Sequence, residues 1–100
     1  MAAITPSRLT AWALLLLALV RTPAVAATCA ERPVSARGEP SRYEVLAKAK
    51  ARANWRAKVR AMPQLGAAYA NFSKALAADY RCSHADGRYL CIASAHPCRD

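Results

Sequence analysis

Acidic residues are scarce in this chain, and their positions leave little room for acid–base catalysis. The 100 residues include six Asp and Glu against 15 Lys and Arg. Asp79, Asp86 and Asp100 are explained by the end of an expected helix, a turn and the C-terminus, so no two carboxylates have the pattern of a general acid and base. We therefore expect a protein without enzymatic activity.

A Cys-x-x-Cys redox motif is also absent, although the chain has four cysteines. An even number of cysteines in a short exported chain predicts disulfides, which leave no free thiol for a nucleophile. A metal site is the other use of such side chains, but the available set matches no known zinc spacing: Cys82, His84, Cys91, His96 and Cys98. We expect no metal and no other cofactor.

The chain has no hydrophobic run long enough to cross a membrane. The longest, residues 9–20, has 12 residues, whereas a span needs about 20. Arg8 precedes this run and the small residues at 24–26 follow it, which is the pattern of a cleaved secretory signal peptide. We predict a signal peptide over residues 1–26, a mature chain beginning at Ala27 or Thr28, and a secreted or periplasmic location. Lipidation of Cys29 is disfavoured because Thr28 precedes it, where Gly, Ala or Ser is usual.

Removal of this segment leaves one small basic domain. Residues 27–100 carry 13 Lys and Arg against 6 Asp and Glu, a net charge of +7. A chain this short buries only about 60% of its unfolded surface, so two disulfides, each contributing about 2–4 kcal/mol, are an expected supplement to its core. Part of the basicity has a compositional explanation, since the abundance of Ala and Arg is typical of GC-rich coding sequence.

The strongest structural pattern is a β-hairpin near the C-terminus. Asp86-Gly87 suits a two-residue type I′ turn. The register then pairs Ala85 with Arg88, His84 with Tyr89, Ser83 with Leu90 and Cys82 with Cys91. Opposed Cα atoms at a non-hydrogen-bonded pair lie about 4.5 Å apart, which a disulfide can span. We predict the disulfides Cys82–Cys91 and Cys29–Cys98; a wider turn, or a helix running as far as Cys82, would instead let Cys82 pair with Cys98 or Cys29.

Two helices are expected before the hairpin. Ser41 and Glu44 have the spacing of a capping box, and this first helix should end near Ala61 because Pro63 disfavours helical geometry at the residue before it. A second helix is expected from about Ala67, where an apolar stripe recurs at helical spacing: Tyr69, Phe72, Leu76 and Tyr80. Residues 27–40 read as a loop, with an edge strand between positions 33 and 37.

The predicted fold class is therefore α+β: two antiparallel helices packed on a C-terminal, disulfide-stapled β-hairpin, formed by residues 41–100. The apolar face of the first helix is narrow. Its apolar and basic side chains fall in one sector: Val45, Ala49, Trp55 and Val59 with Lys48, Arg52 and Arg56.

This mixed face has two interpretations. In the first, the basic stems cover apolar surface while their charges stay in water. Alternatively, the helix is a contact surface for an anionic partner, with Trp55 as an interfacial or stacking anchor among the cations. The candidate anion-binding residues are Lys48, Arg52, Trp55, Arg56 and Arg60, with Lys58 beside them. Six Lys and Arg and no acid lie between Lys48 and Arg60, which favours a polyanion as partner.

Several segments together resemble a broad set of small secreted proteins from alphaproteobacteria that have no established function. These are Asn54-Trp55-Arg56, residues 69–72 (YANF) and the tail ending in His96-Pro97-Cys98. The resemblance implies secretion and disulfides, and it assigns no activity and no site residues.

The expected function is thus a secreted, non-enzymatic module that binds an anionic component of the cell envelope. Three alternatives remain: a protein-binding accessory or inhibitor protein, a membrane-active cationic peptide, and an enzyme, which would need a polar cleft that the sequence does not indicate. Binding that survives high salt would favour a protein partner, because screening weakens contacts between exposed charges.

Overall fold

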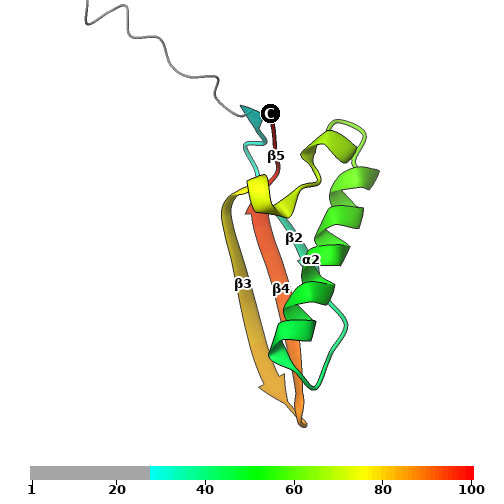
Figure 1. The fold of residues 1–100 in the computed structure, drawn as a ribbon, viewed down its shortest axis with the longest axis vertical. Coiled ribbons are helices and arrows are strands. Elements are labelled where there is room, and N and C mark those ends of the chain that lie inside the picture. The colour runs from blue at the N-terminus through cyan, green and yellow to red at the C-terminus, as the bar shows by residue number, and fades with distance from the viewer. Residues whose placement is uncertain (1–27) are drawn as a thin grey trace, which may run out of the picture.

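The computed structural model describes residues 28–100, which form a three-stranded antiparallel sheet covered on one face by one long helix (Figure 1). The strands lie in the order β2 (Val34–Arg37), β4 (Arg88–His96), β3 (Leu76–Ala85). The helix, α2, spans Glu44–Ala61 and packs on β4 and β2. The predicted signal peptide lies outside the described residues.

The hairpin between β3 and β4 has the predicted turn and register. Asp86 and Gly87 have φ angles of 54° and 73°, the two positive values that a type I′ turn requires. All four predicted cross-strand pairs, from Ala85 with Arg88 to Cys82 with Cys91, are present. The pairing continues to the far end of the sheet and is interrupted by a bulge between Leu76 and Asp79.

Both disulfides have the connectivity that the turn register predicts. Cys82 and Cys91 are joined across the hairpin with their Cα atoms 4.0 Å apart. Cys29 and Cys98 are joined across a second small sheet, formed by β1 (Thr28–Cys29) and β5 (Cys98–Arg99). This second bond ties the two ends of the described chain together, at the end of the molecule opposite the hairpin turn (Figure 1).

The predicted fold of two antiparallel helices on a hairpin is wrong, because the second helix does not form. Residues 67–80 instead make two 3₁₀ turns, η1 (Ala67–Tyr69) and η2 (Phe72–Lys74), followed by the first half of β3. Ala77 has a φ of 56°, which a right-handed helix does not permit. The spacing of the aromatic residues is helical, but β3 gains a ladder with β4 and a disulfide, and these long-range contacts prevail over local propensity.

The predicted capping box is also wrong. The amide of Ser41 donates to the Tyr89 carbonyl at 2.9 Å and so cannot receive the Glu44 carboxylate; Ser41 instead forms a β-bridge with Tyr89. The helix consequently begins at Glu44, with Tyr43 extended at the cap position. Its end at Ala61 agrees with the prediction from Pro63, since Met62 is extended (φ −82°, ψ 120°).

The edge strand expected between positions 33 and 37 is β2, and the residue after it fixes how closely α2 approaches. A Cβ atom on Gly38 would lie 2.4 Å from the backbone nitrogen of Ala51 in α2. The Gly38 amide also donates to the Cys91 carbonyl at 3.0 Å, which holds this position on β4. Glycine is therefore required here by close backbone packing.

Within residues 28–100, no helix is long and apolar enough to cross a membrane.

We expect Gly38→Ala to destabilise the protein by about 1–3 kcal/mol, because the added methyl group forces α2 away from the sheet. Chemical denaturation measures this loss. A free energy of unfolding equal to that of the parent protein would contradict the close packing described here.

The two disulfides should contribute unequally to stability. Cys29–Cys98 closes a separation of 69 residues and Cys82–Cys91 a separation of 9, so chain-entropy arguments give about 4 and about 3 kcal/mol. Replacing Cys29 and Cys98 by Ser should therefore lower the free energy of unfolding more than replacing Cys82 and Cys91. If denaturant titrations gave the reverse order, the Cys82–Cys91 bond would contribute more to stability than closure of its short loop explains.

Candidate functional site

The helix α2 packs on the sheet through residues spaced by four. Ala47, Ala51, Trp55 and Val59 are all 0% exposed. They belong to one core cluster with the inward-facing residues of β4, which are Cys91, Ala93 and Ala95. Small side chains on the strand let the helix lie close, and the indole ring fills the remaining space. The sequence had placed Val45 and Ala49 on this face, but Val45 is 72% exposed.

Trp55 is a core residue and not a surface anchor. Its Nε1 donates to the Val34 carbonyl at 2.9 Å, and its ring meets the Phe72 ring edge to face with the centroids 5.0 Å apart. A wholly buried indole cannot stack on a ligand or enter an interface. Trp55 is therefore removed from the anion-binding candidates.

The other four candidates form a row along one side of α2, each directly following a residue of the buried row: Lys48, Arg52, Arg56 and Arg60. The first two are partly engaged within the protein. The Nη1 of Arg52 donates to the Tyr80 hydroxyl at 3.1 Å, and the Nζ of Lys48 lies 5.6 Å from the centre of the Tyr80 ring. Lys48 also makes a 3.9 Å ion pair with Glu44. These contacts with Tyr80 hold Lys48 and Arg52 beside β3.

The opposite side of the helix is occupied by contacts with β2 and the loop that follows it. Lys58 donates to the Ser35 carbonyl at 2.7 Å, so this cation is separated from the row. The amide of Asn54 donates to the Arg37 carbonyl at 2.8 Å and to the Glu39 carboxylate at 3.0 Å. The hydrogen bond from Asn54, with a second one from the backbone, lowers the pKa of Glu39.

Arg56 and Arg60 border a polar notch between α2 and the 3₁₀ turns. The notch has a volume of about 360 Å³, and Ala67, Ala70 and Asn71 complete its lining. Within the described part of the chain, neither arginine forms an ion pair or a side-chain hydrogen bond. The charge of both guanidinium groups is therefore available to a ligand.

Asn71 adds a third hydrogen-bond donor to this notch. Its Oδ1 accepts from the amide of Ser73 at 3.0 Å and from the Ser73 hydroxyl at 2.6 Å. Because Oδ1 is already occupied, Nδ2 is the part of the Asn71 side chain that remains for a ligand, and Nδ2 can only donate. The side chains that line the notch therefore offer donors, and a ligand with acceptor oxygens and negative charge suits it best.

Sequence reasoning missed Asn71 because it assigned residues 67–80 to a helix. Asparagine favours turns in which its side chain accepts from the backbone amide two residues later, as Asn71 does from Ser73. That signal could have located both the end of the helical region and the third residue of the notch.

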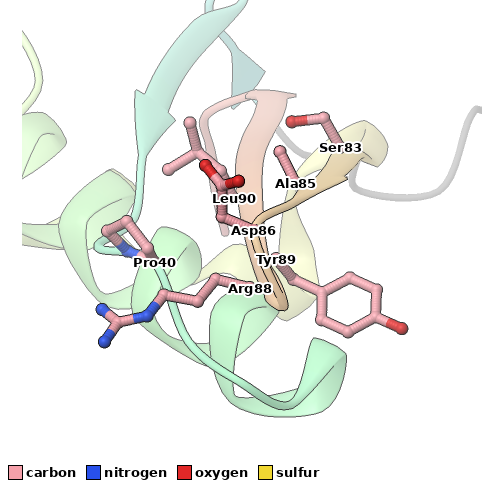
Figure 2. A pocket seen from close by; sticks show the side chains of 7 residues that line it. All are labelled: Pro40, Ser83, Ala85, Asp86, Arg88, Tyr89 and Leu90. Atoms are coloured by element: carbon pink, nitrogen blue, oxygen red, sulfur yellow. The ribbon is translucent and has the colours of Figure 1, made fainter.

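A second, mainly apolar hollow lies beside the hairpin turn and has a volume of about 260 Å³ (Figure 2). Its lining is Pro40, Ser83, Ala85, Asp86, Arg88, Tyr89 and Leu90. Figure 2 shows Arg88 extending beside Pro40, whereas Tyr89 points to the other side of the strand. Asp86 is a turn residue, and within residues 28–100 no hydrogen bond joins the Ser83 hydroxyl to a base that would activate it as a nucleophile.

The histidines and cysteines do not form a reactive centre. All four cysteines are in disulfides. His84 stacks on Tyr89 with the ring centroids 4.4 Å apart, and the Nδ1 of His96 lies 3.0 Å from the Ala30 carbonyl. Within residues 28–100, no group of three His, Cys, Asp or Glu side chains is placed to hold a metal ion.

Comparison of the chain with protein-family models, curated proteins and solved structures finds no match.

Replacing Trp55 by Phe distinguishes a core role from a binding role. The substitution leaves the Val34 carbonyl without its donor and reduces packing against Phe72, so we expect a loss of about 1–3 kcal/mol in stability. Because Trp55 is buried, affinity for an anionic ligand should not change, as measured under conditions where the variant is folded. A weakened affinity without loss of stability would restore Trp55 to the binding site.

Proposed function

We propose that this protein is a secreted, non-enzymatic basic module that binds an anionic component of the cell envelope through α2 and the adjoining 3₁₀ turn. The observation that carries the proposal is the notch in which Arg56, Arg60 and Asn71 present donors without an acidic neighbour. Two guanidinium groups beside an amide form a site for phosphate or carboxylate oxygens.

The rest of the cation row supports this interpretation. Lys48 and Arg52 continue the positive charge from the notch toward the start of the helix. Like charges spaced by four cost a few tenths of a kcal/mol per pair in an isolated helix. An extended anion would relieve that repulsion, whereas a small neutral ligand would not.

Export is supported by the two disulfides, since such bonds persist in oxidising compartments. The disulfides also support the proposed absence of enzymatic activity, because all four cysteines are paired and none can act as a nucleophile. The apolar run at residues 9–20 is assigned to a signal peptide, as its length and flanking residues indicate.

Replacing Arg56 and Arg60 together by Gln should weaken binding to anionic ligands and reduce its dependence on salt. With duplex DNA as a model polyanion, the slope of log K against log salt concentration should become shallower by about 2, because two phosphate contacts are lost. Fluorescence anisotropy over a series of salt concentrations measures this slope. The substitutions leave the contact between Arg52 and Tyr80 in place, so the fold is retained.

The matched control is replacement of Arg81 and Arg88 by Gln. Both are exposed on the sheet, and the change in net charge is the same. The proposal requires this pair to have a clearly smaller effect. Equal effects would mean that binding follows net charge alone, and absence of affinity for DNA, lipopolysaccharide and anionic vesicles at low salt would refute the function.

A further inference from the structure

The start of α2 exposes large apolar side chains that the core does not use. Tyr43 is 64% exposed, Val45 72% and Leu46 48%. The other large hydrophobic residue exposed in the described chain is Leu76, at 59%, near the opposite end of the sheet. Clustering of apolar groups in one helical turn, away from the core, indicates a contact surface.

These side chains lie on the face of α2 that points away from the sheet. At 100° per residue, Val45, Ala49, Ala53 and Leu46 cover an arc of about 100°. The buried row that begins at Ala47 lies on the other side of the helix. The two faces are independent, so the outer arc can contact a partner without any change in the fold.

Cations border this arc on both sides. Lys48 lies about 60° before it and Lys50 about 40° beyond it, and Arg42 precedes the helix. Glu44 is the single acid of this turn, and it pairs with Lys48. A short apolar strip flanked by basic residues with long stems is the pattern of a helix that lies in the interface of an anionic membrane.

We propose that the first turns of α2 dock on an anionic lipid bilayer. Val45 and Leu46 enter the boundary between head groups and acyl chains, and Tyr43 lies at the level of the head groups. Arg42 and Lys50 reach the lipid phosphates beside the apolar strip. This inference rests on the proposed function and specifies its partner.

A second copy of this chain suits the surface less well. A two-fold interface places the same patch of both copies together, so the cations around the apolar strip of one copy would meet those of the other, with Glu44, already paired with Lys48, as the one acid of this turn. A soluble polyanion would contact the cations but gain nothing from Val45 and Leu46. The bilayer uses both the charge and the apolar side chains of the surface.

The test measures binding of the secreted protein, freed of its predicted signal peptide, to vesicles of phosphatidylcholine with and without phosphatidylglycerol, and to heparin. Replacing Val45 and Leu46 by Ser should weaken binding to the phosphatidylglycerol vesicles at least ~10-fold, because two apolar side chains lose their burial. Affinity for heparin should stay unchanged. Both side chains are exposed, so the fold is unaffected.

Leu46→Ser and Leu76→Ser form the matched pair, since they make the same chemical change at exposed leucines of opposite ends of the sheet. Only the first should weaken vesicle binding. If Val45 and Leu46 can be replaced without loss, or if the protein binds heparin and not the vesicles, docking on a bilayer is refuted and the proposed function stands. If neither heparin nor vesicles bind, both are refuted.

Discussion

Packing of α2 on the sheet through every fourth residue is the constraint on which the other features depend. Ala47, Ala51, Trp55 and Val59 must all face β4, and Gly38 allows the helix backbone to come close enough for them to do so. Once these four positions are buried, the direction of every other side chain on the helix is settled. The cation row, the contacts with β2 and the apolar outer arc are consequences of that one orientation.

The same packing explains how the protein tolerates a helix with so little acidic charge. Repulsion between neighbouring cations is worth tenths of a kcal/mol per pair, whereas full burial of Trp55 and Val59 contributes several kcal/mol. Folding therefore does not require these positive charges, and their mutual repulsion is too weak to prevent it. A surface of this kind is free to serve binding, with Arg56 and Arg60 at one end and Val45 and Leu46 at the other.

Turn and proline residues made much of the fold predictable from the sequence. The elements that were predicted wrongly depend on pairing between distant strands. Asp86-Gly87 fixed the turn, the register and therefore the disulfide of Cys82 with Cys91, and Pro63 gave the end of α2. The aromatic spacing of residues 67–80 was helical, but the stretch forms two 3₁₀ turns, and pairing with β4 makes its last part the start of β3. Of the candidate site, the cation row was predictable from spacing, whereas the burial of Trp55 and the contribution of Asn71 depend on the sheet.

The central claim is that an anionic partner binds α2 and the adjoining 3₁₀ turn, and mapping by NMR tests it most directly. Backbone amide shifts of the isotope-labelled protein would be followed during titration with small anionic lipid bicelles. The account predicts changes at Val45, Leu46 and Ala49, with Arg56, Arg60 and Asn71 affected as head groups occupy the notch. Changes confined to the uncovered face of the sheet, around Arg81 and Ile92, would contradict it.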